Sequence, residues 1–289
     1  MLLGFLTIAA VSANVTIHVR SKPIQPAIRI TFETPGERTY CLSSFKSIVL
    51  RLFLWYVKRD EGHEAAAMSR LFAAVRTAEE IAKHFDVDVS SPVSVPSESV
   101  EGASGLIIIE KDGLRLLKSV SWGFPRQTRE MELNGEPPGR IGLVADLTNP
   151  LWDRIVVDPR YRCLIPITHF ANPDGPKGRK TRAWFSNTKE PLIAWAGICR
   201  NTQEFGPVFA GMTMTANELV RPFNDRMPVL LKRAEWDLWL HGSIKDVIAF
   251  QFREPLPSDE FEVLHTRDLW RSGVPPRPKS FPSRESMAI

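Results

Sequence analysis

The stretch RCLIPITHF, residues 162–170, is a short apolar and β-branched run of the kind that forms a β-strand. Residues 105–124 contain two further apolar runs around Asp112-Gly113, and an Asp-Gly pair in this position indicates a β-hairpin. Three more runs of strand character follow at the spacing of an antiparallel or mixed sheet: TRAWFSNT (181–188), PLIAWAGICR (191–200) and PVFAGMTMT (207–215). The sequence therefore predicts a β core.

Short helices are expected on either side of these runs. Thr77 followed by Glu80 forms a capping box, which predicts an amphipathic helix over 77–85. Two later helices are expected, one in LKRAEWDLWLHG (231–242) that stops at Gly242, and one capped by Ser243 and Asp246 that runs through Phe250. Helices and sheet together predict an α+β fold.

Composition sets few limits on function. The chain has 289 residues, 43% hydrophobic and 24% charged, which is ordinary for a globular protein. A net charge of +4 permits a polyanionic partner without requiring one. The cysteines, Cys41, Cys163 and Cys199, form no metal or disulfide pattern, so a reducing cytoplasm fits best; the last two lie in apolar runs and are expected to be buried and inert. The six histidines show no ligand spacing, so neither a metal nor an organic cofactor is predicted.

The two ends of the chain differ from the middle. Residues 1–20 resemble a signal peptide without a basic start, and the apolar run 47–59 carries Arg51 at its centre, which favours a buried strand or helix over a membrane span. We expect 1–67 to be an extension, with a start codon assigned too far upstream as the favoured explanation. The stretch 271–289 is rich in Pro, Ser and charge and is expected to be a disordered tail.

The region between these ends, about 68–270, resembles the SOS response-associated peptidase (SRAP) family, which shields abasic sites in single-stranded DNA. The resemblance rests on five segments in family order: MSRLF (68–72), SWGF (121–124), VDPRYRCLIPITHF (157–170), PLIAWAG (191–197) and RPFNDRMPVLL (221–231). It implies an α+β fold with a mixed, barrel-like β core and flanking helices. It also implies a cytoplasmic monomer that binds single-stranded or abasic DNA, with no membrane partner and no metal.

The family's chemistry uses the residue after the initiator methionine, whose free α-amine and thiol condense with the abasic aldehyde to close a thiazolidine. The resemblance therefore implies that Met68 is the start and that Ser69 becomes the first residue. Serine replaces the family's cysteine, and a hydroxyl is a weaker nucleophile than a thiol. Ser69 is thus either a small residue at a processed terminus or the source of a reversible imine.

Other family positions are also changed. In the alignment to the family, Leu143 falls near the position of the family's asparagine, and Ala145 takes the position of a phosphate-binding arginine. If the alignment is shifted by a few residues, Asp146 or Asn149 supplies the missing polar side chain. The family's glutamate is replaced by Asn172 and its histidine by Asn224, and neither amide exchanges protons as the family residues do. The scaffold motifs are kept while the chemistry is replaced.

The resemblance implies DNA contacts at the residues that survive. Arg226 matches a family arginine that grips phosphate. Trp122 is either a base-stacking residue or a plain core residue, and His169 is either a substitute proton shuttle or a histidine at the core edge. The remaining basic candidates are Arg70 and the run 174–182, with Lys177, Arg179, Lys180 and Arg182, which is either a phosphate contact or a solvated turn.

The function predicted from the sequence is binding of single-stranded or abasic DNA, with weak, reversible or absent covalent capture. One alternative is an N-terminal-nucleophile peptidase or amidohydrolase that uses Ser69. A second is a pseudoenzyme that binds a protein partner in the old groove.

Overall fold

The computed structural model describes residues 71–88 and 93–277, together with four strands between Leu6 and Leu42. The chain divides into two units, Met1–Ala65 and Ala66–Ile289. In the first unit, an antiparallel sheet contains β1 (Leu6–Ala10), β2 (Ala13–Lys22), β3 (Gln25–Phe32) and β4 (Thr39–Leu42) in chain order. The expectations about the run 47–59, about Met68, Ser69 and Arg70, and about the end of the tail lie outside the described residues.

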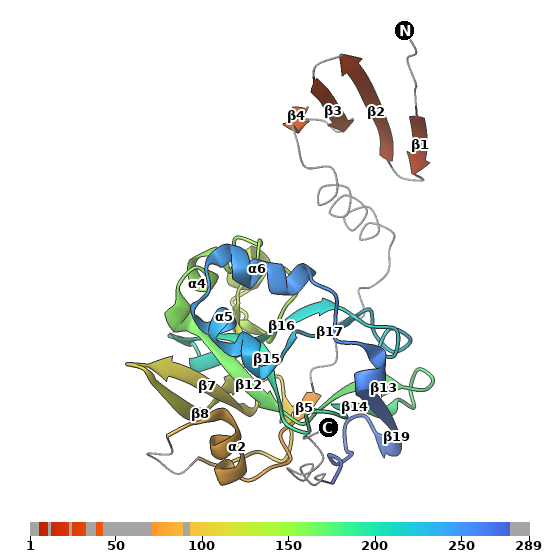
Figure 1. Ribbon diagram of the computed structural model, residues 1–289. Coiled ribbons are helices and arrows are strands. Elements are labelled where there is room, and N and C mark those ends of the chain that lie inside the picture. Colours follow the sequence, from red (N-terminus) through yellow and green to blue (C-terminus); the bar gives the residue numbers. More distant parts are fainter. Residues whose placement is uncertain are drawn as a thin grey trace, which may run out of the picture. The chain divides into compact units, whose positions relative to one another are not determined.

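The second unit is built on a ring of five strands that closes on itself (Figure 1). In ring order these are β16 (Gly206–Thr215), β8 (Leu114–Trp122), β7 (Ser104–Lys111), β12 (Arg162–Ile167) and β15 (Ile193–Thr202). Only the β8–β16 contact in this ring is parallel. Short strands extend it: β11 (Leu143–Val144), β17 (Arg226–Pro228) and β18 (Leu230–Leu231). The predicted barrel-like mixed core is confirmed.

Aromatic side chains fill the core of this unit. The ring of Phe72 meets that of Trp122 edge-on at 5.0 Å, and Trp122 stacks on Phe209 at 6.0 Å. Trp195, from the PLIAWAG segment, donates its indole N–H to the carbonyl of Met212 at 2.6 Å. A Cβ at Gly211 would lie 1.9 Å from this indole, so glycine is required there. The motif residues thus act first as core packing.

A second sheet lies beside the barrel, in the order β19-β14-β13-β5-β6. Its strands are β19 (Phe261–Leu269), β14 (Thr181–Asn187), β13 (His169–Asp174), β5 (Leu71–Ala73) and β6 (Ser99–Val100). The chain passes from β12 to β13 at Thr168, whose backbone N–H and hydroxyl both donate to the carbonyl of Ala73. Because side chains alternate along a strand, β13 turns Phe170 and Asn172 to one face and His169 and Ala171 to the other.

The expected helices and hairpin are present. The helix α2 (Ala78–Phe85) begins with the predicted Thr77–Glu80 capping box, and α6 (Ile244–Phe252) begins with that of Ser243 and Asp246. The β7–β8 hairpin turns at Asp112 and Gly113, both with positive φ. The helix α5 (Trp236–His241) ends at Gly242, as predicted. The remaining helices and strands are α3 (Arg129–Leu133), α4 (Asp153–Val156), β9 (Phe124–Arg126) and β10 (Gly139–Ile141). Three short 3-10 helices complete the unit: η1 (Pro159–Tyr161), η2 (Arg233–Glu235) and η3 (Ser258–Glu260).

The arginine of RCLIP explains how the helices are attached to the barrel. The guanidinium of Arg162 is buried and donates to the carbonyls of Val156, Trp239 and Gly242. Burial lowers its pKa, but these carbonyl oxygens accept its hydrogen bonds and the guanidinium keeps its charge. Arg162 therefore joins α4 and α5 to β12.

Candidate functional site

Asn172, at the family's glutamate position, is fully buried on β13 between β5 and β14. Neither its amide oxygen nor its amide nitrogen has a hydrogen-bond partner among the described residues. A buried polar group without a partner costs about 1–3 kcal/mol, and native proteins retain few of them. Strand β5 begins at Leu71 near this position, because Phe72 pairs with Phe170 in antiparallel register.

A histidine and an aspartate form a pair on the same face of the sheet. Asn172 pairs with Ala183, and Ala183 pairs with His265 on β19, so the three form one row. The Nδ1 atom of His265 lies 2.9 Å from Oδ2 of Asp174, two residues after Asn172. Ala183 is small and leaves room for the imidazole between the two strands. The hydrogen bond from His265 lowers the pKa of the Asp174 carboxyl.

This pair was missed by the sequence reasoning. Its members are 91 positions apart in the chain, and the register between β14 and β19 is irregular near Thr181. No spacing in the sequence indicates which residue of β19 faces Asp174.

Three of the predicted basic residues lie exposed between β13 and β14: Lys177, Arg179 and Lys180. Lys180 donates to the carbonyl of Gly175, and no ion pair with a described residue is formed by Lys177 or Arg179. We call the Asn172 amide, the Asp174–His265 pair and these three cations the hairpin site. It combines positive charge, one titratable imidazole and one buried amide.

Arg226, the best-matched family residue, is largely engaged inside the protein. Its Nη2 donates to the carbonyl of Ala145 at 2.8 Å and to Thr213, and its Nε donates to Thr213 Oγ1. Burial lowers its pKa. Its Nη1 has no hydrogen bond to the described residues. Asn224 accepts the Arg226 backbone N–H at 3.0 Å, so the amide that replaces the family's histidine shapes the turn before β17.

The segment around Leu143 contributes no acid–base group to the site. Leu143 lies on β11, opposite Gly211, and packs against the core. Asp146 accepts bonds from Thr148, and Asn149 accepts one from Leu151, so both side chains stabilise local turns.

Burial favours the core alternative for Trp122 and His169, and it makes Arg182 neither a phosphate contact nor part of a solvated turn. Trp122 is 0% exposed with aromatic rings around it, so it has no free face for a base. His169 is buried on the face of β13 opposite Asn172, next to Trp184, with Nδ1 2.9 Å from Thr168 Oγ1. Arg182 is 2% exposed in its side chain and binds Glu98, with N–O distances of 2.6 and 3.3 Å. None of the three is placed to meet a phosphate or a base.

The two described cysteines are buried, as predicted, and free. They are diagonal neighbours on β12 and β15, since Cys163 pairs with Gly197. Burial, followed by the hydrogen bond to Cys199, raises the pKa of Cys163 well above its usual range. The Cys163 thiol is therefore protonated and inert.

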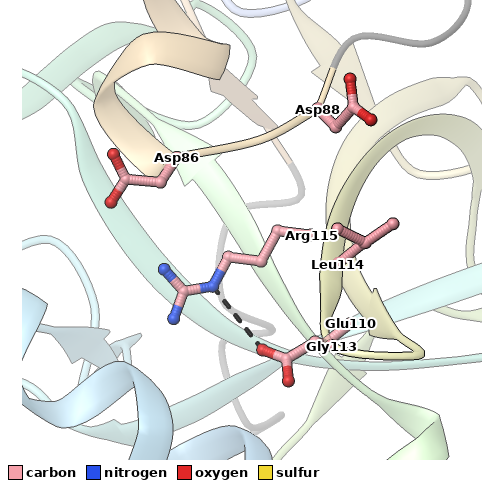
Figure 2. A pocket seen from close by; sticks show the side chains of 6 residues that line it. All are labelled: Asp86, Asp88, Glu110, Gly113, Leu114 and Arg115. Carbon is pink, nitrogen blue, oxygen red and sulfur yellow. Dashed lines mark ion pairs between the residues drawn. The ribbon is translucent and has the colours of Figure 1, made fainter.

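A hollow of about 280 Å³ lies away from the hairpin site, at the β7–β8 hairpin (Figure 2). Its lining contains three carboxylates and one guanidinium, that of Arg115, which pairs with Glu110 at 3.7 Å. Arg115 also binds Asp237 at 2.8 Å. A hollow of this charge repels phosphate, so it is not a candidate for binding a polyanion.

Among residues 71–88 and 93–277, and in the four strands before them, no helix is long and apolar enough to cross a membrane. In the same part of the chain, no three His, Cys, Asp or Glu side chains are grouped to hold a metal ion.

The chain is similar to known proteins over the barrel and its flanking elements. The family model described as SOS response associated peptidase (SRAP) matches residues 62–268. A solved protein from Bordetella bronchiseptica is 19% identical, with a TM-score of 0.57, over 68% of this chain and 99% of its own. One from Bacteroides thetaiotaomicron is 16% identical, with a TM-score of 0.53, over 68% and 91%. No curated protein matches the sequence.

A phage-related protein from Bordetella bronchiseptica has the same kind of similarity, at 17% identity and a TM-score of 0.50, over 68% of this chain and 94% of its own. At these identities the solved structures support the fold alone. The family model covers more than half of the chain. The chain therefore belongs to the SRAP family, whose members are associated with the SOS response to DNA damage.

Proposed function

We propose that this SRAP-family protein binds single-stranded DNA, with or without an abasic site, at the hairpin site, and that covalent capture is at most a reversible imine. The observation that carries the proposal is the three exposed cations Lys177, Arg179 and Lys180 in the loop that follows β13, the strand with the family's glutamate position. Exposed Lys and Arg side chains bind a phosphate backbone through charge and counterion release.

Arg226 supports the same proposal in a second way. Its Nε and Nη2 hold β11 to β16, which fixes the plane of the guanidinium. Its Nη1 remains as a donor of fixed direction for a phosphate oxygen. A preorganised donor of this kind positions the backbone without reading the base.

The imine is the only covalent product that this residue set favours. The α-amine of Ser69 forms it with the ring-opened abasic aldehyde when the chain begins at that residue. Serine lacks the thiol that closes the family's ring, so the imine stays open to hydrolysis. The buried amides of Asn172 and Asn224 do not exchange protons, so they accelerate neither the formation nor the hydrolysis of the imine.

The test is intact-mass spectrometry on protein made from its natural gene and incubated with abasic single-stranded DNA, with and without borohydride. The expected result is a mass that begins at Ser69 and a DNA adduct that survives only after reduction. An intact oligonucleotide without the lesion serves as the control, because it offers no aldehyde.

A mass that includes residues 1–67, or the absence of a reduced adduct, removes the imine from the proposal. DNA retention by the same sample in a gel at low salt then decides whether non-covalent binding remains.

A further inference from the structure

The guanidinium of Arg226 is held by two segments of the chain, β16 and the loop after β11. On β16, the carbonyl of Thr213 accepts Nη2 at 2.6 Å and the Thr213 hydroxyl accepts it at 2.9 Å. In the loop, the carbonyl of Ala145 accepts the same Nη2 at 2.8 Å. Ala145 is exposed and follows a strand of only two residues, so the position of this carbonyl depends on what holds the loop.

A buried glutamine on α6 holds the loop. Gln251 is 6% exposed, and its side-chain oxygen accepts the backbone N–H of Leu147 at 2.9 Å. Its side-chain nitrogen donates to the carbonyl of Ala145. A carbonyl oxygen has two lone pairs, so this one accepts from Gln251 and from Arg226 together. The amide of Gln251 therefore joins α6 to the guanidinium through one shared oxygen.

The two bonds of Gln251 also bracket Asp146, the residue between Ala145 and Leu147. The Oδ1 atom of Asp146 accepts the backbone N–H of Thr148 at 2.9 Å and the Thr148 hydroxyl at 2.6 Å. Burial lowers the pKa of the Arg226 guanidinium, and the charges of Asp225 and Asp146 oppose that lowering. In the described part of the chain, neither carboxylate forms an ion pair with Arg226, so its Nη1 is not occupied by an acid.

We propose that Gln251 is a positioning residue for Arg226, because it fixes the Ala145 carbonyl and thereby the direction in which the guanidinium presents Nη1 to a DNA phosphate. This inference rests on the proposed function. Gln251 is buried and touches no ligand itself. It acts through a carbonyl 106 positions away in the chain. A donor that is held in one direction loses less freedom when it binds, which favours the bound state.

The test is a double-mutant cycle that measures the affinity for a labelled single-stranded oligonucleotide at low salt. Gln251→Met removes the amide and keeps an unbranched side chain. Gln251→Glu is the second variant, since it keeps an acceptor for the backbone N–H and loses the donor to the carbonyl. Each is combined with Arg226→Lys, which keeps the charge without the planar fork. Urea unfolding shows which variants are folded.

The matched control is Thr202→Val. The hydroxyl of Thr202 also accepts one backbone N–H and donates to one carbonyl, at the start of β16, whereas Thr213 lies near the end of that strand. A second measurement needs no DNA. In the free protein, NMR follows the exchange with water of the Arg226 Nε proton, which is donated to the Thr213 hydroxyl at 3.3 Å.

We expect both Gln251 variants to weaken DNA binding about threefold to tenfold, because couplings within one hydrogen-bond network are of that size. In the Arg226→Lys background the same changes are expected to alter the affinity less than about twofold. The Arg226 Nε proton should exchange faster in the Gln251 variants. Thr202→Val is expected to lose stability while keeping both the affinity and the slow exchange.

The inference is overturned if the folded Gln251 variants bind DNA like the unmodified protein, or if they weaken binding equally in both backgrounds, since their effect then does not pass through Arg226. If Arg226→Lys itself keeps full affinity, the phosphate contact of Arg226 fails and this inference fails with it, while binding by the hairpin loop stands. If the unmodified protein binds no DNA, the whole proposed function fails. These results are distinguishable because all of the proteins are measured with the same oligonucleotide.

Discussion

Two β-hairpins of the second unit share one architecture and differ in charge. The hairpins β7–β8 and β13–β14 lie on opposite sides of this unit in Figure 1. Each holds an arginine of its second strand in ion pairs, Arg115 with Glu110 and Asp237, and Arg182 with Glu98. At β7–β8 the surroundings are acidic, whereas the loop of β13–β14 carries three exposed cations. Charge that is paired stabilises the fold, and charge that is unpaired is available to a ligand.

The largest effect is expected from the buried pair of the β13–β14 hairpin. Glu98→Ala leaves the Arg182 guanidinium buried without a counter-charge, which costs about 3–5 kcal/mol of unfolding free energy. The matched change Asp237→Ala removes an 80% exposed partner of Arg115 and is expected to cost less than about 1 kcal/mol. Urea unfolding of both variants measures the difference. Equal losses would contradict the assignment of Arg182 as a structural residue.

The next effect concerns the unpaired cations. Lys177→Glu with Arg179→Glu is expected to weaken binding to single-stranded DNA at least about tenfold at low salt, because two attractive charges become repulsive. The matched control is Lys111→Glu, at the exposed tip of the β7–β8 hairpin. Fluorescence anisotropy with a labelled oligonucleotide measures all three proteins. A loss of similar size in the control would show that only net charge matters.

A third change separates binding from stability within the hairpin site. Asn172→Leu replaces an unpartnered buried amide by an apolar group of similar size and is expected to raise the unfolding free energy by about 1 kcal/mol. Affinity for abasic DNA is expected to stay unchanged in the same variant, because the side chain of Asn172 is fully buried. Thermal unfolding and anisotropy measure the two quantities, and a destabilised variant would show that the amide has a partner in solution.

The smallest effect is a pH dependence at Asp174. The hydrogen bond from His265 lowers the folded-state pKa of this carboxyl, so its contribution to stability is present above the ordinary aspartate pKa. That contribution is lost as the pH falls from the ordinary aspartate pKa through the lowered folded-state pKa. Relative to Asp174→Asn, the unmodified protein should therefore lose stability between about pH 5 and pH 2. Parallel curves for the two proteins would argue against the pair.

Local signals in the sequence predicted the elements well. Four local features could be predicted because each depends only on residues that are close in the sequence. They are the capping boxes at Thr77 and Ser243, the Asp112-Gly113 turn and the helix end at Gly242. The mixed sheet followed from the strand runs, and the barrel-like core followed from the family resemblance. Trp195, from one of these segments, packs so closely on Gly211 that a Cβ there would lie 1.9 Å from its indole.

The site was less predictable because it depends on where each strand ends and on pairing between distant segments. Lys180 and Arg182 are two residues apart, yet one is exposed beyond the strand and the other is buried on β14 against Glu98. Trp122 carries a family motif and is in the core. The pairing of Asp174 with His265 depends on strand order and on an irregular register, and neither is encoded in local spacing.

The most direct test of the central claim is the salt dependence of DNA affinity. The unmodified protein is titrated with an abasic single-stranded oligonucleotide from about 50 to 300 mM potassium chloride. Three phosphate contacts by Lys177, Arg179 and Lys180 predict a slope of about −2 in a plot of log K against log salt concentration. For the Lys177→Glu, Arg179→Glu protein the slope should fall below about 1 in magnitude. A slope near zero, or the same slope in both proteins, would contradict the claim that the β13–β14 hairpin binds the DNA backbone.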